Sequence, residues 1–209
     1  MVEFIDVFKS FGTAIVIDGL SFKIVPDAIN QILGPQSSGK STVIKLIYGA
    51  VKPTSGTVRV FDTDIASLNY SGLVLLRRYI GIIFEDVRLL RGITARENIT
   101  IISRLTGKSV CLVDEAFDML GITKLSNKYP KELSLGEQSL VGIARSIAFN
   151  FPLVIADEPF RYLAANNKKM VLDVFRYLSK KRKMTFLIAT QNSLSDDFNT
   201  FRIDNNETG

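Results

Sequence analysis

Residues 33–42 read LGPQSSGKST, and this stretch decides how the rest of the chain is interpreted. Gly34 to Ser41 fits the pattern G-x-x-x-x-G-K-[ST], with the apolar run INQIL before it and a helical pattern after it. Glycines let such a loop point its N–H groups at phosphate oxygens, and the helix N-terminus adds a positive dipole. Lys40 would reach the β and γ phosphates, and the Ser41 hydroxyl would ligate Mg²⁺. The predicted phosphate-binding loop comprises Gly34, Pro35, Gln36, Ser37, Ser38, Gly39, Lys40, Ser41 and Thr42.

A second motif is the apolar run LVIADEP, residues 153–159, which ends in two acids. An entirely apolar strand is typical of a buried parallel sheet, and such sheets bind ligands beyond the carboxyl ends of their strands. Asp157 would hold Mg²⁺ through water, and Glu158 would act as a general base on an attacking water, worth roughly 10² to 10⁴ in rate. Two solvated acids at a strand end are the alternative, and the phosphate loop in the same chain favours the catalytic interpretation.

The stretch LSLGEQSLVGIARSI, residues 133–147, has two readings. Ser134 and Glu137 form a capping-box pattern before an apolar run, which predicts a well-capped helix. An exposed helix N-terminus that carries Ser134 and Gly136 would also offer hydrogen-bond donors to an anion. The residues alone leave both readings open.

The order of elements predicts a single α/β domain over residues 1–209. The first third alternates like strands and turns, and residues 86–132 are mostly helical, with a capping box from Thr94 to Glu97. From residue 139 onward helices and apolar strands alternate, which indicates βαβ units and a parallel sheet. The final FRIDNNETG would form an edge strand and an Asn-rich turn.

The composition is that of a protein with a well-packed core: 46% of the residues are hydrophobic and the net charge is +5. No segment reaches the roughly 18 to 20 uninterrupted apolar residues that a membrane helix needs, and the N-terminus lacks a signal-peptide pattern, so a cytoplasmic protein is expected. With no histidine in the chain, imidazole is excluded as a base or metal ligand. Cys111 is expected to be buried or half-buried in a helix, and the basic run at 180–184 to be a solvated helix end.

Taken in order, GPQSSGKST, LSLGEQ and IADEP resemble the motifs of the nucleotide-binding subunits of ABC transporters over essentially the whole chain. KLIYG, LRRYIGIIFEDVRLL, TARENI and ARSIAFNFPLVIADEP are most similar to the FtsE group of cell-division subunits. Lipoprotein-releasing and MacB-like exporters have similar stretches. The resemblance implies the ABC ATPase fold: a P-loop NTPase core with a mainly parallel sheet, an N-terminal antiparallel β subdomain and a helical subdomain near 86–132.

The resemblance also implies ATP and Mg²⁺ as ligands and a head-to-tail homodimer. ATP would lie between the phosphate loop of one copy and Ser134, Gly136 and Glu137 of the other. Phe11 would stack on adenine. The expected partner is an FtsX-like polytopic membrane protein, met at the inner face of the cell membrane by the segment 86–99, whose Val87, Leu89, Leu90 and Ile93 would be exposed.

Five motif positions depart from the family pattern. They are Ser37 and Leu135, each in place of a glycine, Glu85 for a glutamine, Ala164 for an aspartate and Gln191 for a histidine. Ser37 would fit if its backbone is not left-handed, and Leu135 would fit as the first residue of the helix.

Two of these departures, Glu85 and Gln191, fall among the residues predicted to act on ATP. The predicted catalytic residues are Glu158, Lys40, Gln191 and Glu85, and the predicted Mg²⁺ ligands are Ser41, Glu85 and Asp157. Glu85 beside the γ-phosphate would add like-charge repulsion of about 4 kcal/mol at about 4 Å and an effective dielectric near 20. Gln191 would donate a hydrogen bond to that phosphate without a positive charge. We therefore expect ATP binding to be retained and hydrolysis to be slow.

Three other functions are considered. The chain would alternatively serve a lipoprotein-releasing or MacB-like exporter, or act as a nearly inactive nucleotide-gated regulatory module. A nucleic-acid-linked ATPase of the repair or ribosome kind is disfavoured, since the sequence has no coiled-coil insert between GKST and LSLGEQ and no second cassette. No nucleic-acid partner is expected.

Overall fold

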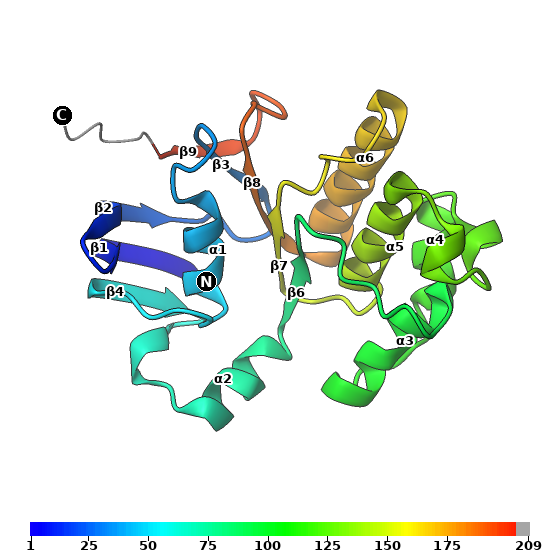
Figure 1. Ribbon diagram of the computed structural model, residues 1–209, viewed down its shortest axis with the longest axis horizontal. Helices are drawn as coiled ribbons and strands as arrows, with labels where there is room; N and C mark the ends of the chain where they lie inside the picture. The colour runs from blue at the N-terminus through cyan, green and yellow to red at the C-terminus, as the bar shows by residue number, and fades with distance from the viewer. Residues whose placement is uncertain (204–209) are drawn as a thin grey trace.

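The computed structural model describes residues 1–203, which form two β-sheets flanked by helices (Figure 1). The antiparallel sheet has the order β2-β1-β4-β5, with β1 Val2–Phe11, β2 Ala14–Lys23, β4 Ser55–Val60 and β5 Thr63–Asp64. The other sheet is parallel throughout, in the order β6-β7-β8-β3-β9. Its strands are β3 Ile29–Leu33, β6 Ile80–Ile83, β7 Leu153–Asp157, β8 Thr185–Thr190 and β9 Asn199–Arg202. The predicted parallel core and N-terminal antiparallel sheet are both confirmed.

Helices cover both faces of the parallel sheet. They are α1 Lys40–Ile47, α2 Tyr70–Arg77, α3 Ala95–Thr106, α4 Val113–Met119, α5 Leu135–Ile147 and α6 Ala165–Arg182, with 3₁₀ turns at Ile65–Ser67, Thr123–Leu125 and Pro130–Glu132. Figure 1 shows α1 and the antiparallel sheet on one side of the parallel sheet, and α3 to α6 on the other. Helices α3 and α4 fall within the range where the sequence predicts a helical insert.

Two hydrophobic cores hold these layers together. One joins α3 to α6 to the parallel sheet and contains the stacked rings of Phe175 and Phe186, whose centroids are 4.4 Å apart. The other joins α1, the antiparallel sheet and the opposite face of the parallel sheet, with Phe4 and Ile47 fully buried. Because every residue of β3 and β8 is buried, both central strands read as uninterrupted apolar or uncharged runs.

Both predicted capping boxes are present. Thr94 and Glu97 open α3, and Ser134 and Glu137 open α5. Strand β9 pairs with β3 at the edge of the parallel sheet as expected, while the Asn-rich turn after it lies outside the described residues. None of the helices within residues 1–203 has the length and hydrophobicity that spanning a bilayer requires.

Two side-chain predictions outside the motifs have different outcomes. Cys111 is exposed, so the expected burial is wrong: α4 begins only at Val113, and Cys111 lies in the turn before it. The basic run ends α6 as expected, with Lys180 and Lys181 exposed and Lys183 closing the helix in the left-handed conformation.

Candidate functional site

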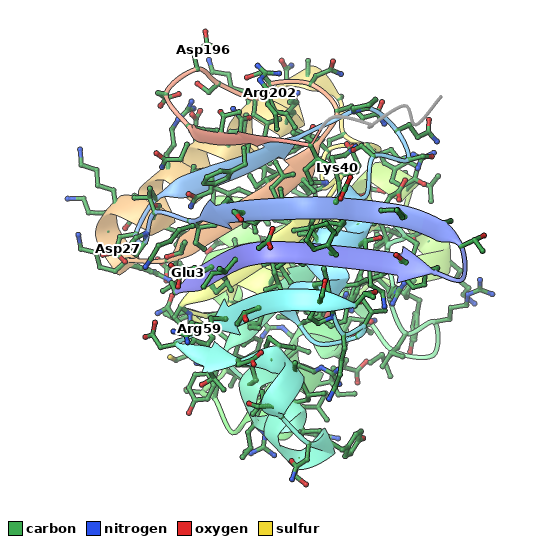
Figure 2. All side chains as sticks on the ribbon, turned by 90° about the vertical axis from the view of Figure 1, so that its left-hand side faces the viewer. Glu3, Asp27, Lys40, Arg59, Asp196 and Arg202 are labelled. Carbon is green, nitrogen blue, oxygen red and sulfur yellow. The ribbon has the colours of Figure 1, made fainter. Side chains whose placement is uncertain are left out.

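The predicted phosphate-binding loop joins β3 to α1. Gly39 precedes the first helical residue with φ 93°, and a Cβ there would lie 2.8 Å from the Val16 carbonyl oxygen of β2, so glycine is required. Figure 2, which faces the antiparallel sheet, shows Lys40 beside β2. The buried Lys40 Nζ donates to the carbonyl oxygens of Gly34 and Pro35, both at 2.7 Å. Its ammonium is therefore held at the loop, where the motif places phosphate oxygens.

Ser37 does not meet the condition set for it. Its φ is 66°, so the backbone is left-handed, and the condition under which a serine was expected to fit is not met. The loop must still turn at this point, where the family pattern has a glycine, and an L-residue there costs roughly 1 to 2 kcal/mol. The neighbouring Ser38 Oγ is buried without a hydrogen-bond partner. The loop therefore has a strained backbone at Ser37 and a buried hydroxyl oxygen at Ser38 that makes no hydrogen bond.

A polar cavity of about 490 Å³ lies beside this loop. Its lining comes from Gln36, Ser37, Lys40, Ser41, Glu85, Asp157, Glu158, Arg161, Gln191 and Asn192. These residues lie at or just beyond the carboxyl ends of four parallel strands, β3, β6, β7 and β8, which meet at one edge of the sheet. The structure thus brings together all the predicted catalytic and Mg²⁺-binding side chains.

Asp157 and Glu158 are two partly buried acids of the polar cavity. Burial raises the pKa of the Asp157 carboxyl, while a hydrogen bond with Ser41 and the charge of Lys40 lower it. Burial likewise raises the pKa of Glu158 against the lowering effect of Lys40. Glu158 also has a left-handed backbone, with φ 44°. Strained backbone and raised carboxyl pKa values are typical of functional sites.

The cavity offers donor atoms suited to Mg²⁺. Asp157 Oδ1 and Glu158 Oε1 are buried and have no hydrogen-bond partner. Within residues 1–203 no group of three His, Cys, Asp or Glu side chains is arranged to hold a metal by itself. Mg²⁺ is usually held by one or two carboxylates together with substrate phosphates. A hydroxyl at Ser41 and a free carboxylate oxygen at Asp157 fit that type of site.

Glu85 forms an ion pair with Arg161 at the edge of the polar cavity. The expected repulsion between Glu85 and phosphate therefore needs correction, because a guanidinium neutralises the carboxylate. Arg161 and Asn192 line the cavity although neither was predicted as a site residue. Of the segment between β7 and α6, only Ala164 was noted as a departure from the family pattern. The parallel pairing of β6 with β7 is the signal that would have found Arg161, since residues just beyond neighbouring strands lie close together.

Beyond the phosphate-binding loop, the four other predicted nucleotide-binding residues lie outside the lining of the polar cavity. Phe11 ends β1 with 49% of its surface exposed, and the Lys9 ammonium lies 4.7 Å from its ring centroid. Ser134, Gly136 and Glu137 begin α5, where Glu137 Oε2 accepts hydrogen bonds from Ser134 N and Oγ at 2.8 and 2.9 Å. These hydrogen bonds lower the pKa of Glu137.

Leu135 follows the Ser134 cap as the first residue of α5, as expected, and it is 57% exposed.

A separate, mostly apolar cavity of about 540 Å³ lies among α2, β6 and α3. Its lining comprises Val74, Arg77, Arg78, Ile80, Gly81, Ile82, Phe84, Arg88, Ile102, Leu105, Thr106, Arg145, Ser146 and Phe151. In the nearby segment 86–99, Leu90 is 52% exposed, but Leu89 is partly buried against the hydrophobic core. The expectation of four exposed apolar side chains is therefore wrong for Leu89, as it is for the half-buried Val87 and Ile93.

Sequence comparison places this geometry among known proteins. Residues 17–161 match the ABC transporter family. The cell division ATP-binding protein FtsE of Bacillus subtilis is 32% identical over 92% of this chain and 86% of its own length. The methionine import ATP-binding protein MetN of Caulobacter vibrioides is also 32% identical, over 91% of this chain and 59% of its own length. The chain thus spans most of FtsE and little more than half of MetN.

Solved structures of one cassette, MJ0796, have the same fold. Its dimeric structure as a bacterial ABC transporter cassette gives a TM-score of 0.90 at 25% identity, covering 98% of this chain and 94% of that one. Its dimer in a post-hydrolysis state, bound to ADP and Pi, gives a TM-score of 0.83 at 27% identity, and the match covers 92% of this chain and 88% of that one.

Proposed function

The chain belongs to the ABC transporter family, and we propose that it is the ATP-binding subunit of an FtsEX-like complex that couples ATP binding and slow hydrolysis to cell-wall remodelling. The observation that carries this proposal is the polar cavity, in which the loop lysine, the loop hydroxyl and the two partly buried acids Asp157 and Glu158 converge. The similarity to FtsE over most of both chains supports the cell-division role.

The predicted catalytic and Mg²⁺-binding side chains of the polar cavity each have a part in this proposal. Lys40 and the loop N–H groups hold the β and γ phosphates. Ser41, Asp157 and Glu85 would hold Mg²⁺, which when bound offsets phosphate charge. Because its pKa is raised, Glu158 is a better proton acceptor for the attacking water.

Hydrolysis is proposed to be slow because one contact to the γ-phosphate is weak. Gln191 donates a hydrogen bond to the γ-phosphate without the charge of a histidine. The loss of one charge-stabilising contact typically lowers the rate on the order of 10² to 10³.

A second copy of the chain is proposed to complete the nucleotide site. Ser134, Gly136 and Glu137 lie outside the polar cavity of their own chain, so they are available to a neighbour's nucleotide. Leu135 and Tyr162 add exposed apolar surface beside them, 57% and 38% exposed. The dimeric state of the MJ0796 cassette supports a head-to-tail homodimer, with Phe11 stacking on adenine at the open end.

The proposed membrane partner is an FtsX-like polytopic protein at the inner face of the cell membrane, and the apolar cavity is its docking site. A cavity of this size accommodates side chains from a short helix. Four arginines also line it, Arg77, Arg78, Arg88 and Arg145, and none of its lining residues within 1–203 is acidic. An occupant with apolar and acidic side chains therefore fits best. Strand β6 connects this cavity to Glu85 and thereby to the nucleotide.

Two alternatives rest on particular observations. The similarity to MetN, described as a methionine import protein, favours a transporter subunit over a cell-division subunit. The exporter alternative, of the lipoprotein-releasing or MacB-like type, is supported by the similar sequence stretches alone. Gln191 and Ala164 favour a nearly inactive nucleotide-gated regulatory module.

Binding of a fluorescent, non-hydrolysable ATP analogue with Mg²⁺ tests the proposal. Wild-type protein is expected to bind it, and Lys40→Ala to lose most of the affinity, because Lys40 Nζ is the buried cation of the loop. Lys23→Ala is a matched control, since Lys23 lies on β2 in an exposed ion pair with Glu3. Equal affinity of wild type and Lys40→Ala would contradict the phosphate-loop assignment.

A further inference from the structure

We propose that Arg161 binds the γ-phosphate of ATP and so determines the preference of this site for triphosphate over diphosphate. This inference rests on the proposed function, because it requires the polar cavity to be the nucleotide site. It assigns Arg161 to binding of the γ-phosphate, a role separate from the effect of Gln191 on the rate of hydrolysis.

The position of Arg161 is fixed by its backbone. Arg161 N donates to Glu158 O at 3.2 Å, so the residue follows the proposed base by one tight turn at the carboxyl end of β7. Its side chain lines the polar cavity together with Lys40, Glu158 and Gln191. The guanidinium therefore belongs to the same edge of the sheet as the phosphate-binding loop.

The charges of the cavity leave Arg161 available for a ligand. Among the described lining residues there are three acids, Glu85, Asp157 and Glu158, and two cations, Lys40 and Arg161. The lysine is buried and already donates to two loop carbonyls. Arg161 keeps 54% of its side chain exposed, so it is the lining cation with freedom to turn toward a ligand.

Phosphate can displace Glu85 from this guanidinium. Exposed ion pairs contribute only about 0 to 1 kcal/mol, and 38% of the Glu85 side chain is exposed here. A planar guanidinium makes bidentate hydrogen bonds to phosphate, which are among the stronger ones in proteins. Exchange of Glu85 for the γ-phosphate would also release the Glu85 carboxylate, which the proposed function assigns to Mg²⁺.

A purely compensating role for Arg161 is the alternative, in which it only neutralises Glu85. The two roles are separable because Glu85→Gln removes the charge that needs neutralising. If Arg161 binds phosphate, Arg161→Ala lowers ATP affinity whether residue 85 is Glu or Gln. If it only compensates, the loss occurs with Glu85 and vanishes in the Gln background.

The experiment is titration of a fluorescent non-hydrolysable ATP analogue and of the matching ADP analogue, with Mg²⁺, against five proteins. These are wild type, Arg161→Ala, Arg161→Lys, Glu85→Gln and the double variant Glu85→Gln/Arg161→Ala. We expect Arg161→Ala to weaken ATP binding about 10- to 100-fold and to leave ADP binding within about 2-fold. Arg161→Lys is expected to restore part of the loss, and Glu85→Gln to tighten ATP binding.

Arg96→Ala serves as the control, because Arg96 is similarly exposed and paired with Asp114 on helices away from the cavity. Equal losses for ATP and ADP, or a loss that vanishes in the Glu85→Gln background, would overturn the inference. Wild-type protein that binds neither nucleotide, or a Lys40→Ala variant that binds normally, would overturn the proposed function itself. Circular dichroism of each variant shows whether a loss of nucleotide affinity is caused by unfolding. If Arg161→Ala is unfolded, Arg161→Lys is compared with wild type instead.

Discussion

Lys40 Nζ lies 4.0 Å from Glu158 Oε1 across the polar cavity, an attraction between charges that is too long to be a hydrogen bond. The Glu158 oxygen is buried and has no hydrogen-bond partner, so it remains free to accept a proton from water.

We therefore predict that Glu158→Gln lowers ATP turnover by at least about 10²-fold, while ATP affinity is unchanged. Phosphate release and binding of a fluorescent ATP analogue are the two measurements. Glu3→Gln is the matched control, since Glu3 pairs with Lys23 on the antiparallel sheet. Turnover that survives in Glu158→Gln would remove this residue from the role of base.

The slow hydrolysis proposed for wild type is expected to respond to a double change. Glu85→Gln combined with Gln191→His should raise turnover by at least about 10-fold, because a charge-stabilising contact to the γ-phosphate is worth roughly 10² or more in rate. Each single variant is measured beside the double one. Unchanged turnover in a double variant that still binds ATP would show that these two positions do not limit hydrolysis.

The sequence was sufficient to predict most of the fold. The phosphate-loop motif around Lys40, the apolar run before Asp157 and the capping boxes each depend on residues that are close together in the sequence. They can therefore be identified without knowing how distant segments pack. The parallel order of the last strands followed from alternation of helices and apolar runs. What the sequence could not supply is which strands become neighbours, since pairing depends on packing between segments far apart in the chain.

The same limit explains the errors at the site. Glu85 and Arg161 are 76 residues apart, and their ion pair appears only when β6 lies beside β7. The left-handed backbone of Ser37 is likewise set by the path from β3 to α1, and a serine gives no sign of it. Leu89 was expected to be exposed, but it packs against the hydrophobic core to which α3 and α5 contribute.

Position 37 allows a direct test of backbone strain. Ser37 has φ 66°, where glycine is unstrained and a β-branched residue is strongly disfavoured. We predict that Ser37→Gly keeps or improves ATP affinity. Ser37→Val should weaken ATP binding and should lower the free energy of unfolding by about 1 to 2 kcal/mol, seen as a lower thermal midpoint. Titration with the fluorescent ATP analogue and thermal unfolding give the two readouts. A valine variant equal to wild type in both would show that the loop does not need this conformation.

The carboxylate of Asp157 is expected to lower the free energy of unfolding of the protein. Burial raises the pKa of its carboxyl above the unfolded value, so the associated stability is present below the unfolded pKa and is lost as the pH rises through the folded pKa. Asp157→Asn should therefore raise the free energy of unfolding by about 0.5 to 2 kcal/mol at pH 7.5.

The gain from Asp157→Asn should shrink as the pH falls through the raised pKa of the wild-type carboxyl, because below that pKa the aspartate is also neutral. Urea unfolding in metal-free buffer at several pH values measures this, and the same variant should lose Mg²⁺-dependent ATP binding. A lower stability of Asp157→Asn at pH 7.5 would mean that Lys40 and Ser41 outweigh the effect of burial.

The surface around the apolar cavity gives the last prediction. Leu90 is 52% exposed, so an aspartate is tolerated there by the fold, whereas Leu89 packs against the core and its replacement would disturb folding. Leu105 is 62% exposed and lines the cavity itself. We predict that Leu90→Asp and Leu105→Asp keep ATP affinity and thermal stability near wild type. Both should abolish copurification with an FtsX-like membrane protein coexpressed from the same genome.

Val25→Asp is the control, because Val25 is 44% exposed and lies just before β3, at the end of the parallel sheet opposite the phosphate loop. Arg78→Glu extends the test to charge: Arg78 is exposed and lines the apolar cavity, so reversing its sign should weaken a partner with acidic groups. Copurification that survives Leu90→Asp, Leu105→Asp and Arg78→Glu would place the membrane partner on another surface. Loss with the two leucine variants but not with Arg78→Glu would show that the partner binds through apolar contacts alone.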